Sequence, residues 1–150
     1  MSKTNAPYLR TGVEEYLGRL KHYCKFEYVE LPDIKASKNL SEKEICKKEG
    51  ESFQKQIDQS DYLVLLDEGG KSFSSLQFAD QLANWQLQSF KRLHFLIGGA
   101  YGFDPTIYEQ SDLKISLSNM TFSHQMVRLL FLEQLYRGHT ILKGEPYHHR

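Results

Sequence analysis

The sequence has little of what marks the specialised classes of protein. Only two of its 150 residues are cysteines, Cys24 and Cys46, without CxxC spacing, which fits free thiols in a reducing compartment. The longest apolar run, residues 62–66, is too short to cross a bilayer, and the N-terminal MSKTNAPYLR lacks the apolar core of a signal peptide. We therefore expect a cytoplasmic protein with no membrane partner.

The chain also lacks net charge. Nineteen basic and nineteen acidic side chains balance to zero, so there is no overall attraction to nucleic acid or to an anionic membrane. A nucleic-acid partner would have to be bound by a local patch. The length fits a single domain over residues 1–150, and the chain has no repeats, linkers or low-complexity segments.

Several catalytic and ligand-binding motifs are missing. The segment GGAYG is not the GxGxxG fingerprint of dinucleotide-binding proteins, and no GxxxxGK[ST] phosphate loop or GxSxG nucleophile turn occurs. His139, His148 and His149 have no carboxylate at a ligand spacing near them, so we predict no metal site.

Helical and strand patterns alternate along the chain. Apolar residues at helical spacing, with caps at Ser41, at Ser74 or Ser75, at Asp104 and at Ser123, predict helices. These cover residues 8–22, 41 to about 57, 74 to about 89, a short stretch from 104, and 123 to about 137. The third helix is expected to turn Leu76, Ala79, Leu82, Ala83 and Leu87 inward.

Strands are predicted between these helices. The expected strands are residues 26–31, with one wet face, and residues 62–66, 93–97 and 114–117, while residues 33–40 form a polar loop. The run YLVLL is apolar on both faces, as in a strand covered by helices on both sides. The fold class is therefore α/β: an open, mostly parallel sheet with helices on both faces.

Three strand ends carry residues suited to a small-molecule pocket. LLDEGGK (66–71) and IGGAYG (97–102) supply glycines that let backbone approach a ligand, and SLSNMTFS (116–123) supplies small polar side chains. Ligands of open α/β sheets bind beyond the carboxyl ends of strands. The alternative is that these glycines only turn the chain after each strand.

Four segments together resemble one known family. LLDEGGK, FLIGGAYGF, ISLSNMTFSHQMVRLLFLEQLYRG and the terminal GEPYHH are similar to the ribosomal RNA large subunit methyltransferase H family of SPOUT-class methyltransferases. The resemblance implies a homodimer with a C-terminal trefoil knot that uses S-adenosylmethionine. It also implies methylation of N3 of a pseudouridine in helix 69 of 23S rRNA, on assembled ribosomes.

The resemblance further implies a set of site residues. The cofactor would be bound by Leu66, Gly98, Leu117, Ser118, Asn119, Met120, Thr121 and Phe122. We expect His148 to take or relay the N3 proton, while Arg137 and Tyr147 hold the target base and phosphates across the dimer interface. Alternatively, Arg137 only complements the helix dipole and Tyr147 is a packing ring.

Three questions stay open at this stage. The final helix is apolar nearly all round, which fits either a partner subunit or central burial within one chain. The family begins with an apolar strand and a Gly-Lys turn, which this sequence lacks, so we expect that strand to be missing here. Either the true start of the protein lies upstream, or the protein has lost this strand. The alternative function is a non-catalytic α/β protein that binds a nucleotide-like ligand and associates with ribosomes.

Overall fold

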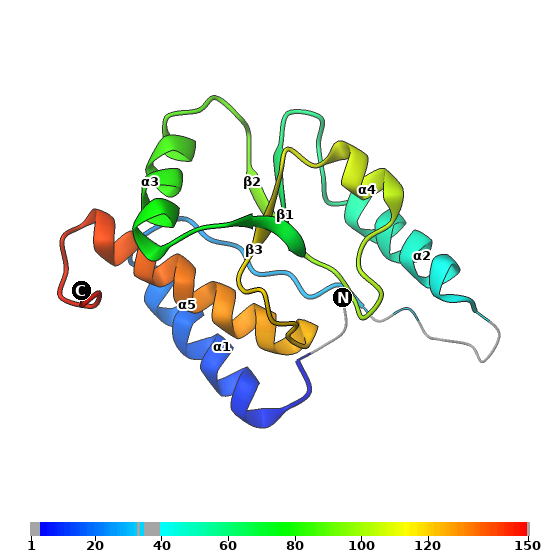
Figure 1. Cartoon of the computed structure of the whole chain (residues 1–150), viewed down its shortest axis with the longest axis horizontal. Coiled ribbons are helices and arrows are strands. Elements are labelled where there is room, and N and C mark those ends of the chain that lie inside the picture. Colours follow the sequence, from blue (N-terminus) through cyan, green and yellow to red (C-terminus); the bar gives the residue numbers. More distant parts are fainter. Residues whose placement is uncertain (1–3, 33, 35–39, 150) are drawn as a thin grey trace.

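A parallel sheet of three strands forms the centre of the computed structural model, which describes residues 4–32, 34 and 40–149. The strands are β1 (Tyr62–Ser72), β2 (Leu93–Ile97) and β3 (Leu113–Ser116), in the order β2-β1-β3 (Figure 1). β1 is central because its run Leu63–Leu66 is buried throughout, as a strand covered on both faces must be. The predicted open parallel sheet is confirmed.

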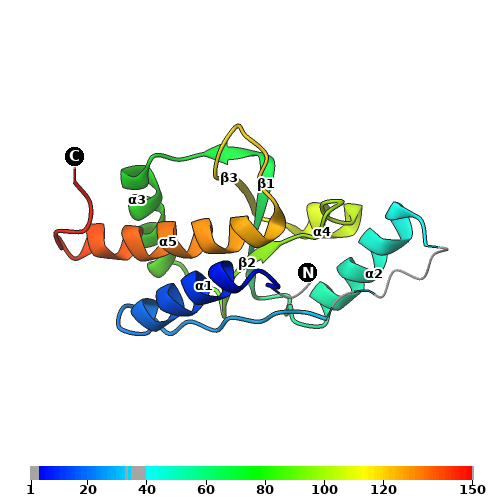
Figure 2. The same ribbon diagram turned by 90° about the horizontal axis from the view of Figure 1, so that it is seen from below.

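Helices cover both faces of this sheet (Figures 1 and 2). They are α1 (Pro7–Leu20), α2 (Glu42–Gln54), α3 (Ser75–Gln86), α4 (Pro105–Gln110) and α5 (His124–Leu142). α3 and α5 pack on one face, with α1 outside α5, and α2 and α4 lie on the other. None of the helices in the described part of the chain is long and apolar enough to span a membrane.

The predicted helix caps are confirmed. Ser41 and Ser74 each accept a hydrogen bond from the backbone N–H three residues on, and Glu44 and Gln77 complete the two capping boxes. Ser123 caps α5 in the same way through the Met126 N–H. These hydrogen bonds satisfy backbone donors that the first turn of a helix leaves without a partner.

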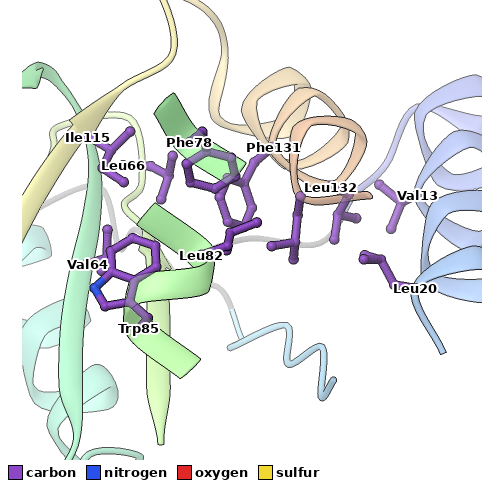
Figure 3. Packing of buried hydrophobic residues seen from close by; sticks show 11 residues of the cluster. Val13, Leu20, Val64, Leu66, Phe78, Leu82, Trp85, Ile115, Phe131 and Leu132 are labelled. Atoms are coloured by element: carbon purple, nitrogen blue, oxygen red, sulfur yellow. The ribbon is translucent and has the colours of Figure 1, made fainter. Parts of the chain in front are cut away.

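The core has two parts because the side chains of β1 alternate between its faces. Val64 and Leu66 join the larger cluster with α1, α3 and α5, where Phe131 and Leu132 lie between the sheet and α1 (Figure 3). Leu65 points the opposite way, into a smaller cluster with α2 and α4. A single five-residue apolar run therefore supports both helical layers.

One predicted strand is wrong. Residues 26–31 form no strand, although Phe26 and Tyr28 are half-buried while Glu27 and Val29 are exposed, the alternation of an extended segment. Within the described residues β2 pairs with β1 alone, so residues 26–31 have no neighbouring strand to pair with. A strand needs a partner as well as a pattern.

Smaller differences concern element ends and faces. Leu87 lies beyond α3 and is 85% exposed, and Leu76 is also exposed; Phe78 and Trp85 fill the inner face in their place. α5 runs five residues past its predicted end at Arg137, to Leu142. Most of the predicted loop 33–40 lies outside the described residues.

Burial of His139 in α5 predicts a pH-dependent stability. The side chain is only 8% exposed, and burial, followed by the nearby Lys143 charge, lowers its pKa. The unfolded chain thus binds this proton more readily, so the free energy of unfolding should fall as pH drops below about 6.5, by at most about 1.4 kcal/mol per pH unit.

Replacing His139 with Gln should flatten this dependence between pH 7 and 5, measured by urea denaturation. The exposed His149 serves as the control, and His149→Gln should keep the slope of the unaltered protein. An unchanged slope in His139→Gln would contradict the assignment.

Candidate active site

At the first of the three predicted strand ends, after Leu66, β1 and β3 are in close contact. Leu66 and Lys71 both pair with Ile115, so residues 67–70 bulge out of the ladder, and the strand continues to Ser72. The predicted end of this strand at Leu66, ahead of Gly69 and Gly70, is therefore wrong. A Cβ at Gly70 would lie 2.6 Å from the Ile115 backbone nitrogen, which only a glycine avoids.

The second strand end is a tight glycine loop. Gly98 follows Ile97, the register partner of Leu66, so the loop after β2 starts beside the bulge of β1. A Cβ at Gly98 would lie 2.8 Å from the carbonyl oxygen of Gly102. The loop folds back on itself through a bridge between Gly99 and Gly102, leaving the Tyr101 side chain 50% exposed.

The third strand end connects β3 to α5 and closes a small cavity. Ser116 Oγ donates to the carbonyl of Ser118, and the Ser118 hydroxyl accepts from the Met120 N–H, both at 2.9 Å. The cavity, of about 60 Å³, lies between this loop and the end of β1. It is lined by Leu66, Asp67, Glu68, Ile115, Ser116, Leu117, Ser118, Met120, Phe122 and Val127.

Five of the eight predicted cofactor residues meet at this cavity: Leu66, Leu117, Ser118, Met120 and Phe122. Of the other three, Thr121 donates a hydrogen bond of 2.9 Å from Oγ1 to Glu68, whose side chain lines the cavity. Gly98 and Asn119 are outside the lining. The segments after the buried run of β1 and after β3 thus share this cavity, whereas the glycine loop after β2 contributes no lining residue.

Two acidic residues of this site were not singled out from the sequence. Asp67 accepts hydrogen bonds from the Tyr108 hydroxyl, at 2.6 Å, and from the Gly69 N–H, at 2.8 Å. Burial, with the hydrogen bond to Asp67, raises the pKa of Tyr108 to about 12, so this donor stays protonated near neutrality. Asp67 and Glu68 directly follow the buried run 63–66, and this position was a signal in the sequence that could have identified them.

The C-terminal residues form a second cluster against α1 and α5. The Tyr147 hydroxyl lies 3.1 Å from both Glu133 Oε1 and the Tyr16 hydroxyl, and its ring packs edge-on against Tyr136 at 4.8 Å. Arg137 pairs with Glu133 and stacks over the Tyr147 ring, 4.8 Å from its centroid. The tail is packed rather than frayed, and Arg137 and Tyr147 are brought together.

His148 follows Tyr147 and is half-buried. Its Nδ1 is buried and has no hydrogen-bond partner among the described residues. Glu133 and Tyr16, which position this cluster, are absent from the sequence-based prediction. The spacing of Glu133 and Arg137 by four residues in a helix was a usable signal, whereas nothing local connects Tyr16 to the tail.

The C-terminal tail and the loop predicted to bind the cofactor, between β3 and α5, lie at opposite ends of α5. Ser123 caps one end of the helix and Arg137 lies fourteen positions further on, about 20 Å away at the rise of an α-helix. Figure 1 shows the same separation, with the C-terminus far from the connection between β3 and α5. A single copy of the chain does not bring the two clusters together.

Known proteins resemble this chain over its length. A model of the family described as predicted SPOUT methyltransferase matches residues 1–148. The chain belongs to this family. Two similar proteins, each named ribosomal RNA large subunit methyltransferase H, come from Christiangramia forsetii and Flavobacterium psychrophilum. They are 52% and 53% identical to it, over all of this chain and 96% of their own.

A third relative of the same name, from Parabacteroides distasonis, is 52% identical over 99% of this chain and 95% of its own. The predicted resemblance is thereby confirmed, and the protein is an enzyme of the methyltransferase class. In this SPOUT methyltransferase the cavity and the segments of β1 and of the β3–α5 connection that line it are the candidate active site.

Substituting Gly70 tests the close backbone contact between β1 and β3 beside the cavity. Gly70→Ala would drive a Cβ into the β3 backbone, and overpacking of this kind costs about 2 kcal/mol. We expect the thermal midpoint to fall by about 4–8 °C.

The matched control is Gly18→Ala in α1, where a Cβ has nothing within 4 Å and the helical preference of alanine is slightly stabilising. Equal thermal midpoints for the Gly70→Ala variant and the unaltered protein would contradict this expectation, because the β3 backbone would then make room for the new Cβ without loss of stability.

Proposed function

We propose that the protein transfers a methyl group from S-adenosylmethionine to N3 of a pseudouridine in helix 69 of 23S rRNA, on assembled ribosomes in the cytoplasm. The observation that supports this most is the identity of about half the residues, over the whole chain, with relatives named ribosomal RNA large subunit methyltransferase H. Their name gives the class of substrate, and the resemblance noted in the sequence gives the base and the donor.

The chemistry of the cavity residues fits this donor. Leu66, Leu117 and Met120 offer apolar surface to an adenine ring, and the backbone around Ser118 offers polar groups. Asp67 and Glu68 bring negative charge to the site. A ligand with a sulfonium and an ammonium group would be attracted to these carboxylates.

The loops would have to open to admit the donor. A cavity of about 60 Å³ holds about two water molecules, whereas small-molecule sites are about 300–1,000 Å³. Met120 is 74% exposed and Phe122 is 40% exposed, so few contacts oppose movement of the segment between β3 and α5. We propose that this segment forms the family's trefoil knot and closes over the donor.

Proton removal is the chemical step left to the protein. When bound, S-adenosylmethionine supplies a methyl group already activated on a sulfonium, so positioning does much of the catalysis. The N3–H proton must leave as the nitrogen forms its new bond to carbon. We assign its acceptance to His148, with Arg137 and Tyr147 holding the base and its phosphates.

A homodimer would unite the two halves of the site. Because tail and cofactor loops are about 20 Å apart along α5, the tail of one subunit would meet the loops of the other. Half-buried Leu129 and Leu130 on α5, with the exposed Met120 and Phe122, provide apolar surface for such an interface. Packing of α5 between the sheet and α1 within one chain already accounts for most of its apolar side chains, so only the partly exposed ones are left for such an interface.

The function is tested by transfer of a labelled methyl group to intact ribosomes that lack this modification, with free 23S rRNA in parallel. We expect methylation of ribosomes. His148→Ala should lower the rate about 10²- to 10⁴-fold, as loss of a general base does.

His149→Ala is the matched control, since it removes the adjacent, exposed histidine, and should change the rate little. No transfer to either substrate by the unaltered protein would overturn the proposed function. Near-normal transfer by His148→Ala, with donor binding intact, would remove only the role of His148.

Replacing Glu68 should weaken binding of the charged donor, S-adenosylmethionine, more than binding of its neutral product, S-adenosylhomocysteine. Glu68 lies at the cavity and Glu68→Gln removes one negative charge there while keeping an acceptor for Thr121. Affinity for S-adenosylmethionine, which carries the sulfonium charge, should fall several-fold, and affinity for S-adenosylhomocysteine should change less.

Calorimetry with both ligands measures this difference. Asp80→Asn, an exposed carboxylate change on α3, is the control and should leave both affinities unchanged. Equal loss for the two ligands would mean that Glu68 acts by holding Thr121 and not by charge.

A further inference from the structure

Tyr101, in the glycine loop after β2, differs from most tyrosines of this protein. Of the nine tyrosines only Tyr8 and Tyr101 are exposed, at 67% and 50%. Each of the other seven makes a side-chain hydrogen bond or packs against another ring. Within the described residues the Tyr101 side chain does neither, so its ring is available to a ligand.

The backbone that carries this ring is held in place. The Tyr101 carbonyl accepts a hydrogen bond of 3.4 Å from the Cys46 thiol of α2. Gly102 has a φ of +79°, which favours glycine, and its N–H donates to the Gly99 carbonyl at 3.4 Å. Phe103 is buried. A ring on a fixed backbone loses little conformational entropy when it binds a ligand.

The loop lies beside the candidate active site. The end of β2 pairs with Leu66 of β1, which lines the cavity. A Cβ at Gly102 would lie 3.5 Å from the Tyr108 hydroxyl, and this hydroxyl donates to Asp67, another residue of the lining. Tyr101 is therefore attached next to the cavity without lining it.

We propose that the Tyr101 ring stacks on the base of an unpaired rRNA nucleotide that flanks the target nucleotide. Tyr101 is then a substrate-binding residue, which the site residues implied by the family resemblance do not include. The inference rests on the proposed function, because it requires an RNA substrate.

Methylation of N3 favours a contact of this kind. N3 lies on the edge of the base that pairs with another strand, so the target must be unpaired when it reacts. Proteins bind unpaired nucleotides by stacking their bases on aromatic rings. Because Tyr101 lies beside the donor cavity and not in its lining, its ring is placed for a neighbouring base, and the methylated base can approach the donor.

The charges beside the loop favour a base over a phosphate as the ligand of Tyr101. Asp67 and Glu68 line the cavity, and neither forms an ion pair within the described part of the chain. Two carboxylates repel a phosphate group, whereas the face of an uncharged base is not repelled. The geometry and the charge therefore agree on a base.

Steady-state methylation of ribosomes that lack the modification tests this contact. Tyr101→Ala should raise the KM for ribosomes about 5- to 100-fold, as expected for loss of one base-stacking ring, with kcat nearly unchanged. Tyr101→Phe keeps the ring and should keep the KM of the unaltered protein. Tyr101→Leu is apolar without a ring and should behave like Tyr101→Ala.

Three controls separate this role from a structural one. Calorimetry should give the same affinity for S-adenosylmethionine in Tyr101→Ala as in the unaltered protein, because Tyr101 is outside the cavity lining. The thermal midpoint should move by no more than about 2 °C, since the side chain is half-exposed. Tyr8→Ala removes the other exposed tyrosine, on α1, and should leave the KM unchanged.

Several results would overturn the inference. An unchanged KM in Tyr101→Ala, while the unaltered protein methylates ribosomes, would remove the stacking role and leave the proposed function intact. Weaker donor binding in Tyr101→Ala would mean that the ring supports the cavity. A raised KM in Tyr101→Phe would assign the contact to the hydroxyl, and a normal KM in Tyr101→Leu would indicate an apolar contact, as with a ribosomal protein. No transfer by the unaltered protein would overturn the proposed function and this inference together.

Discussion

Burial of β1 on both faces is the constraint on which the rest of this structure depends. Val64 and Leu66 anchor one helical layer and Leu65 the other, so one short strand holds both cores in place. A strand buried on both faces must pair along its edges, since water cannot satisfy its backbone groups. β2 and β3 supply those partners, and their direction follows from the helices that connect them.

The position of the candidate active site follows from this arrangement because parallel strands end at the same edge. The bulge of β1 and the segment after β3 meet at the cavity, where the close backbone contact at Gly70 joins β1 to β3, and the glycine loop after β2 lies beside the bulge. On its outer side β2 borders a groove of about 860 Å³ that residues 24–31 also line.

Sequence patterns predicted the elements well where local chemistry decides them. The capping boxes at Ser41 and Ser74 and the cap at Ser123 mark helix starts through hydrogen bonds within one turn. Residues 26–31 show the limit: their alternation is that of a strand, but pairing depends on a neighbour distant in sequence. Likewise the eight predicted cofactor residues came from a family resemblance, and five of them meet at the cavity.

By itself, then, the sequence determined the fold class, the order and starts of most helices and strands, and the family, because these depend on local periodicity, caps and motifs. Only the tertiary structure decided that β1 continues past its glycines, that Asp67 is held by Tyr108, and that Tyr147 meets Tyr16 and Glu133. The tertiary structure also showed that the C-terminal tail and the loop predicted to bind the cofactor lie at opposite ends of α5. Such contacts join residues far apart in the chain, and no pattern within a segment specifies them.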